Sequence, residues 1–188
     1  MDAIVPAFLA ALLAEFGDKT QLLTVLLAAR FGRPGLVLAG VAGAAIVNSL
    51  IAAVGGAMLI GVIPFRALNL LLALALIFAG GGALLPQKQP HVGIYDRLGV
   101  FGASLLAFFI LELGDKTQFL TFAFAARSPT PLLAGVGAAA GIIAASLPAV
   151  ALGAALPNVV PLRRIRIGVG LLLLIVGIVV ALSALRLW

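Results

Sequence analysis

Two short motifs hold most of the ionisable groups in the apolar segments of this chain. The first reads Glu15-Phe16-Gly17-Asp18-Lys19-Thr20-Gln21, and the second reads Glu112-Leu113-Gly114-Asp115-Lys116-Thr117-Gln118. A charged side chain at the centre of a membrane-spanning helix costs roughly 2.5–3.5 kcal/mol on insertion scales. These side chains are therefore expected to contact one another, water or a bound ion. The rest of the chain must supply the scaffold that brings them together.

The charges of the two motifs indicate which ion they could bind. Each motif carries two acids and one lysine, so the pair has a net charge of −2 when every group is ionised. One divalent cation neutralises that charge, and so do two protons on the carboxylates, which means that metal and protons would compete. Carboxylate, amide and hydroxyl oxygens suit hard ions such as Ca²⁺, Mn²⁺ or Mg²⁺. The lysines are expected to neutralise the carboxylates or pair with them.

Softer metals are disfavoured by the residues that the chain lacks near these motifs. There is no cysteine, and the one histidine, His91, falls in a polar loop, where it is expected to be solvated. The composition therefore argues against Zn²⁺ and Cu⁺, which prefer nitrogen and sulfur ligands, and against a disulfide framework. We expect no cofactor apart from the transported ion.

The local geometry of each motif has two possible forms. On a straight helix Glu15, Asp18 and Gln21 would form one slanted row, with Lys19 one turn from Glu15. Thr20 would then point elsewhere and need another partner. A break at Gly17 is the alternative, because glycine permits backbone conformations closed to other residues. The sequence leaves both forms open.

The composition is that of a chain dissolved in lipid. Of its 188 residues 64% are hydrophobic and 10% are charged, against about a quarter charged in soluble domains. Six apolar segments are long enough to cross about 30 Å of hydrocarbon: Ile4–Ala29, Gly35–Ile60, Arg66–Leu85, Leu98–Ala126, Pro131–Leu156 and Arg163–Leu187. They are continuously apolar without alternation, which predicts helices and not a barrel.

An internal repeat relates the two halves. Glu15 and Glu112 are 97 positions apart, and the same offset pairs Pro64 with Pro161 and Arg66 with Arg163. Each half holds three spans, so the second half must enter the membrane upside down, as in many secondary transporters with a midplane site between repeats. We predict an all-α membrane protein with six transmembrane helices in two inverted three-helix repeats, 1–85 and 98–188, joined by a linker loop 86–97.

The basic residues predict how the protein sits in the membrane. The loops after spans one, three and five hold Arg30, Arg33, Lys88, Arg97, Arg163, Arg164 and Arg166, whereas the opposite face holds Arg66, Arg127 and Arg186. The positive-inside rule then places both termini outside the cytoplasm.

The first apolar run has no basic segment before it and is expected to stay as a span in a bacterial inner membrane. The net charge of +6 is scattered through loops, so the lipid bilayer and not nucleic acid is the expected partner.

Other polar and small residues have simpler interpretations. Asn48, Ser49 and Ser146 lie near the middles of the second and fifth spans, where they could line the site or bond to neighbouring helices. The glycines at 55–56 and 80–82 are expected to be close-packing surfaces. A single buried Glu–Lys pair could also have the purely structural role of holding two helices together. The duplication of the motif favours a functional role.

The Glu-x-Gly-Asp-Lys-Thr stretches at 15–20 and 112–117 resemble the GDT family of cation/proton exchangers, in the second calcium/cation antiporter superfamily. That family is marked by two copies of Glu-x-Gly-Asp-(Lys/Arg)-(Thr/Ser), each in the first span of a three-helix half. The resemblance implies a proton-coupled Ca²⁺/Mn²⁺ transporter of Golgi membranes, or a manganese exporter in bacteria. By motif match the cation and proton site would comprise Glu15, Asp18, Glu112 and Asp115, with Lys19, Thr20, Lys116 and Thr117 as supporting residues. Gln21 and Gln118 extend the supporting set; the short basic linker differs from the long acidic loop of some members.

The resulting functional prediction is a secondary transporter, not an enzyme. It exchanges Mn²⁺ and/or Ca²⁺ for protons by alternating access, as a manganese exporter, and a homo-oligomer is compatible with it. Three rivals remain open: export of an amino acid or another small solute, a passive cation channel, and an intramembrane aspartyl protease. The protease would need two aspartates that share a proton, whereas the adjacent lysines favour ionised carboxylates and leave the glutamates without a role.

Overall fold

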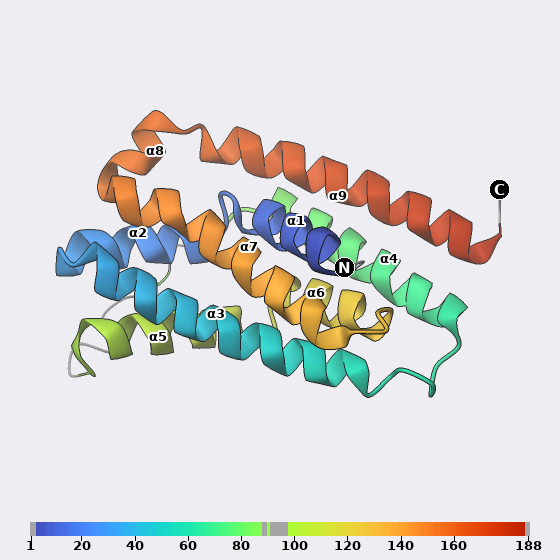
Figure 1. Cartoon of the computed structure of the whole chain (residues 1–188). Helices are drawn as coiled ribbons and strands as arrows, with labels where there is room; N and C mark the ends of the chain where they lie inside the picture. Colours follow the sequence, from blue (N-terminus) through green and yellow to red (C-terminus); the bar gives the residue numbers. More distant parts are fainter. Residues whose placement is uncertain (1–2, 88–89, 91–97, 187–188) are drawn as a thin grey trace.

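The computed structural model describes residues 3–87, 90 and 98–186 of the chain (Figure 1). Within these ranges the regular elements are all helical and no strand occurs. The all-α prediction is confirmed for this part of the chain. Most of the predicted linker 86–97 lies outside the described residues, as do His91, Lys88 and Arg97.

The helices follow the predicted segments closely. In chain order they are α1 (Ile4–Glu15), α2 (Lys19–Phe31), α3 (Pro34–Ala57), α4 (Phe65–Leu84), α5 (Gly99–Glu112), α6 (Lys116–Ala126), α7 (Pro131–Leu152), the 3₁₀ turn η2 (Gly153–Ala155), α8 (Leu156–Val159) and α9 (Leu162–Leu185). Four helical segments are long and apolar enough to cross a membrane, namely α3, α4, α9 and the stretch from Pro131 to Val159. Helices α1 and α5 are apolar but shorter. The chain is an integral membrane protein.

The first and fourth predicted spans are each broken in two at the motif. Helix α1 ends at Glu15, and the chain passes through extended Phe16 and then Gly17 at φ +74° before α2 begins at Lys19. The second motif repeats this path, with Gly114 at φ +75°. Positive φ is open to glycine and costly for other residues. The straight slanted row of Glu15, Asp18 and Gln21 is therefore wrong, and the break is confirmed.

The remaining helices also repeat at the 97-residue offset. Helices α3 and α7 begin at Pro34 and Pro131, a favourable first position because proline has no N–H to leave unpaired. Figure 1 shows α3 and α7 running in opposite directions, and α4 and α9 likewise. Helices α4 and α9 pack closely at Gly80, where an added Cβ would lie 2.7 Å from the carbonyl oxygen of Gly170. The close-packing prediction therefore holds at Gly80, whereas an added Cβ at Gly81 would meet nothing within 4 Å.

The fifth predicted span, Pro131–Leu156, falls within the helical stretch Pro131–Val159, which turns at Gly153. Helix α7 stops at Leu152, because Gly153 adopts φ +49°, and η2 and α8 then lead to α9. Leu156 is buried in this connection and packs with Val25 and Ala149. The corresponding connection between α3 and α4 forms only turns.

Candidate metal centre

The two breaks meet inside the molecule and bring acids from both motifs together. One carboxylate oxygen each from Glu15, Glu112 and Asp115 lie within 4.8 Å of one another. Oxygens on opposite sides of a Ca²⁺ ion are roughly 4.6–5.2 Å apart, given Ca–O distances of 2.3–2.6 Å. Glu15 and Glu112 are 2% and 0% exposed, so these two carboxylates are sheltered from solvent. The three side chains therefore have the chemistry and the spacing of ligands for a hard cation.

Glu15 is held by threonines from both motifs. The hydroxyl of Thr20 donates a hydrogen bond to Oε2, and the hydroxyl of Thr117 donates one to Oε1 at 2.5 Å. Thr24 and Thr121 each donate to the carbonyl one turn earlier, at 2.9 and 2.8 Å. The break thus turns Thr20 toward Glu15, which a straight helix would not do.

Glu112 has a different environment although it occupies the matching position. It is fully buried, and neither of its carboxylate oxygens has a hydrogen-bond partner among the described residues. A buried polar group without a partner is rare in folded proteins and requires an explanation. A cation or a proton on this carboxylate would satisfy it.

The lysines pair with aspartates across the two motifs. Lys116 Nζ lies 2.6 Å from Asp18 Oδ2, and Lys19 Nζ lies 2.7 Å from Asp115 Oδ1. The first pair is the more buried, with side-chain exposures of 6% and 1% against 28% and 14% for the second. Sequence reasoning expected lysine–carboxylate pairs, but not that each lysine would reach the other motif. Asp18, one of the four predicted ligands, lies in such a pair and outside the three-carboxylate cluster.

The glutamine side chains connect each helix break to the opposite half of the protein by hydrogen bonds. Gln21 accepts a hydrogen bond from the Gly17 N–H at 2.9 Å and donates to the Ala145 carbonyl at 2.8 Å. Gln118 accepts from the Gly114 N–H at 2.6 Å and donates to the Asn48 carbonyl at 3.5 Å. Ala145 and Asn48 are themselves related by the 97-residue offset. These amides satisfy backbone groups that a broken helix leaves unpaired, so both glutamines are braces and not ligands here.

The other predicted lining residues separate into two groups. Asn48 donates a hydrogen bond to the Phe109 carbonyl at 3.2 Å, one turn before Glu112. Its side-chain oxygen and the Ser49 hydroxyl are buried without a partner in the described structure. Ser146 instead donates to the Ile142 carbonyl of its own helix at 2.9 Å. Asn48 therefore lies beside the second motif, whereas the Ser146 hydroxyl is occupied within α7.

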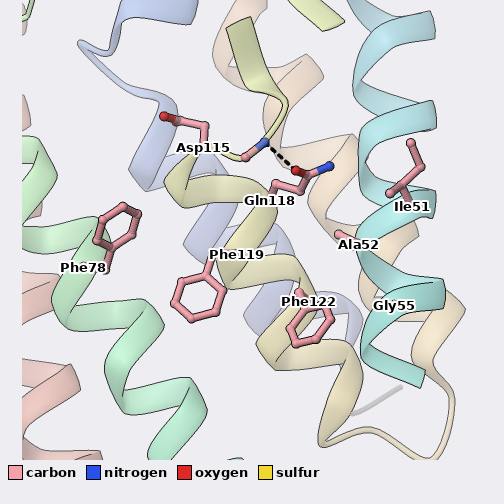
Figure 2. Close-up of a pocket in the computed structure, with 9 residues that line it drawn as sticks. Ile51, Ala52, Gly55, Phe78, Asp115, Gln118, Phe119 and Phe122 are labelled. Atoms are coloured by element: carbon pink, nitrogen blue, oxygen red, sulfur yellow. Dashed lines mark hydrogen bonds between the residues drawn. The ribbon is translucent and has the colours of Figure 1, made fainter. Parts of the chain in front are cut away.

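A cavity of about 470 Å³ leads to the second motif. Figure 2 shows Asp115 at one end, Phe119 and Phe122 following along α6, and Phe78 of α4 facing them across from Ile51 of α3. Gly114 also lines this cavity, which we call the α6 groove. Sequence reasoning missed its aromatic walls, because phenylalanines on an apolar helix look the same whether they face lipid or a cavity.

The first motif is more closely packed than the second, since Gly17 is buried and Gly114 is exposed. A Cβ added to Gly17 would lie 2.7 Å from the Leu162 carbonyl oxygen and 3.0 Å from Arg166 Cβ, whereas one added to Gly114 would meet nothing within 4 Å. Both sites have positive φ, so alanine costs about 1–2 kcal/mol at either one. We expect Gly17→Ala to lower thermal stability in detergent more than Gly114→Ala. Equal losses would contradict this asymmetry.

Comparison with known proteins identifies the family. A family model described as "Divalent cation/proton antiporter GDT1" matches residues 3–91 and 100–187. A protein of Vibrio cholerae serotype O1 named "Putative manganese exporter" is 35% identical over 164 residues, which cover 86% of this chain and 82% of that protein. No solved structure matches. With its two matched stretches spanning nearly the whole sequence, the chain belongs to the GDT1 family of divalent cation/proton antiporters.

Proposed function

We propose that this protein exports Mn²⁺ in exchange for protons, with Ca²⁺ as a second possible cargo. The observation that carries the proposal is the cluster of buried Glu15 and Glu112 with half-buried Asp115, which contribute carboxylate oxygens within 4.8 Å of one another. The family transports divalent cations, and the Vibrio cholerae relative is named for manganese. The cargo would bind to these carboxylates, and protons would replace it.

The charge balance of the site supports exchange. Four carboxylates and two lysines leave a net charge of −2 when all are ionised, and one divalent cation or two protons neutralise it. The cross-pairs with lysine keep Asp18 and Asp115 compensated, so the uncompensated charge falls on Glu15 and Glu112. These glutamates would then carry the protons. Lys19 would release Asp115 when the cation binds, while the more buried pair of Lys116 and Asp18 stays in place.

The same cross-pairs argue against a protease. An aspartyl dyad needs two carboxylates that share one proton. Asp18 and Asp115 each lie within 2.7 Å of a lysine from the opposite motif instead. Both aspartates are therefore placed to act as compensated anions.

The proposed architecture has six membrane crossings. Helices α1 and α2 would form one broken span and α5 and α6 another, which adds two crossings to the four long helical segments. The opposite directions of α3 and α7, and of α4 and α9 (Figure 1), support an inverted repeat. The repeats would be residues 1–85 and 98–188, with the site between them. Broken helices that line a site at the repeat interface are frequent in secondary transporters.

We further propose that the protein lies in the bacterial inner membrane with both termini outside the cytoplasm. Arg30 lies in the last turn of α2 and Arg33 follows that helix, and Arg163, Arg164 and Arg166 lie at the start of α9. In Figure 1 the end of α2 and the start of α9 lie at the same end of the molecule. Arg66 and Arg186 lie at the other end, where Arg66 donates hydrogen bonds to the carbonyls of Ala184 and Leu185. The end richer in arginine is expected to face the cytoplasm.

Transport in proteoliposomes tests the proposal. With the lumen at lower pH than the bath, we expect Mn²⁺ to accumulate in the lumen, because protons leave down their gradient in exchange. Raising the lumen to the bath pH should remove the accumulation. Mn²⁺, Ca²⁺ and Mg²⁺ are compared in parallel, with protein-free liposomes as the control. Accumulation that is indifferent to the pH gradient, or uptake of an amino acid instead of any metal, would contradict the proposal.

A further inference from the structure

The two halves of the molecule differ at the connections that precede their last helices. The α7–α9 connector, residues 153–161, folds against α2 and buries Leu156 in a cluster with Val25 and Ala149. Leu162 then places its carbonyl oxygen over Gly17. Gly17 and Asp18 are both buried, and the connector leaves beside Gly17 a pocket of about 700 Å³ that Arg163, Arg164 and Arg166 also line.

The α3–α4 connector, residues 58–64, is more exposed although its sequence corresponds: Leu59 and Ile63 are partly buried and its other residues are exposed. At the 97-residue offset Leu156 corresponds to Leu59, and Leu162 corresponds to Phe65. Both counterparts are large and apolar. Met58 and Val62 are 71% and 74% exposed, and Phe65 is 60% exposed. Arg127 lies 5.5 Å from the Phe65 ring centroid, outside the α6 groove.

The surface that this connector would cover is the α6 groove. Leu156 packs with two residues, Val25 and Ala149. At the 97-residue offset Val25 corresponds to Phe122, and Ala149 corresponds to Ala52. Both counterparts line the open groove, and so does Gly114, the counterpart of the covered Gly17. The α7–α9 connector therefore packs on Val25 and Ala149, whereas their counterparts Phe122 and Ala52 line an open groove.

The composition of the α3–α4 connector fits the same interpretation. Its seven residues, Met58-Leu59-Ile60-Gly61-Val62-Ile63-Pro64, include no charged or hydrogen-bonding side chain. Ile63 corresponds to Val160, which packs beside the Leu156 cluster. Gly61 has φ +78° and nothing within 4 Å of an added Cβ, so a hinge is available next to Leu59.

We propose that the α3–α4 connector is a lid that closes the α6 groove, with Leu59 between Phe122 and Ala52 and the Phe65 backbone over Gly114. The lid closes when the α7–α9 connector leaves α2, so that one motif is covered at a time. This inference rests on the proposed exchange function, since it names the parts that would alternate access to the carboxylates. Closure breaks the contact between Arg127 and Phe65 and brings apolar side chains against the aromatic wall of the groove.

Disulfide trapping tests the lid, and the chain has no native cysteine to interfere. Two variants matched by the offset are made in the full chain: Val25→Cys/Leu156→Cys for the closed half and Leu59→Cys/Phe122→Cys for the open half. Each is oxidised in proteoliposomes at two pH values, with and without Mn²⁺, and the intramolecular link is detected by mass spectrometry. The four single-cysteine variants control for links between molecules.

Both pairs are expected to link, and each link should stop Mn²⁺ transport until it is reduced. Failure of the 59/122 pair to link under all four conditions, while the 25/156 pair does, would overturn the proposal. Failure of the 25/156 pair would overturn it as well, because that pair is closed in the structure. Linking needs no transport activity. If both pairs link but the reduced variants move no Mn²⁺, the exchange function alone is refuted. If the reduced variants move Mn²⁺ but the 59/122 pair never links, the lid alone is refuted.

Discussion

A Glu112→Gln protein is expected to fold and to lose at least about 100-fold in Mn²⁺ transport, since removal of even the outer partners of metal ligands costs 10–100-fold. Glu112 is fully buried, and both of its oxygens lack a hydrogen-bond partner in the described part of the chain. Replacement by the amide therefore strands no donor that depends on the carboxylate. It removes one negative charge from the three-carboxylate cluster and one place for a proton.

The control for this variant is Ser104→Ala. Ser104 lies on the same helix α5, is also fully buried and also has an unpartnered side-chain oxygen, but it carries no charge. Transport rates are measured at equal amounts of folded protein, judged by gel filtration. Wild-type transport by Glu112→Gln would remove Glu112 from the site, and an equal loss in Ser104→Ala would mean that burial and not charge is responsible.

An Asp18→Asn protein is expected to be severely destabilised, by roughly 3–5 kcal/mol, because one partner of a buried ion pair is left without its opposite charge. Lys116 and Asp18 are 2.6 Å apart with side-chain exposures of 6% and 1%. Asp115 also lies 3.5 Å from the same ammonium, but it is itself engaged by Lys19. The measurement is thermal unfolding of the purified protein in one detergent.

The matched control is Lys19→Gln, which breaks the equivalent pair in the more exposed position. We expect a smaller loss of stability there, because surface-accessible ion pairs contribute about 0–1 kcal/mol. The double variant Asp18→Asn/Lys116→Gln should recover most of the stability lost in Asp18→Asn, since it removes the stranded charge. If the double variant is as unstable as Asp18→Asn alone, the loss of stability does not come from the unpaired charge of Lys116. That result would contradict the role given to the ion pair.

Much of the fold follows from the sequence because lipid allows few backbone arrangements. The prolines at 34 and 131 and the glycine-rich turns mark helix ends, and the offset of 97 residues relates the halves. Continuous apolar runs between them predict helices, since every backbone group must be paired within the membrane. The turn after α7 is not predictable from the sequence, because Gly153 lies in an apolar stretch with no polar residue to mark it.

The site was predictable in composition but not in pairing. Each motif could be read as one unit, yet Lys19 and Lys116 reach the aspartate of the other motif. That pairing depends on how two broken helices cross, and spacing along one helix carries no information on it. The sequence does not decide whether the helix breaks, because Gly17 is compatible with a straight helix as well as with positive φ.

The difference between the halves could not be predicted from the repeat. Matching positions have nearly the same residues, yet Asp18 is buried and Asp115 is half-buried, and Gly17 is covered where Gly114 is open. A repeated sequence specifies both arrangements equally. Which half is covered is a property of one conformation of the whole chain.

Proton movement driven by a metal gradient tests coupled exchange most directly. Proteoliposomes with a weakly buffered lumen and a trapped pH dye are given external Mn²⁺ with no initial pH difference. We expect the lumen to become more alkaline as Mn²⁺ enters, with about two protons leaving per ion in an electroneutral exchange at a site of net charge −2. The Glu15→Gln and Glu112→Gln variants should show neither flux. Mn²⁺ influx with no change in lumen pH would contradict exchange and indicate a passive path for the cation.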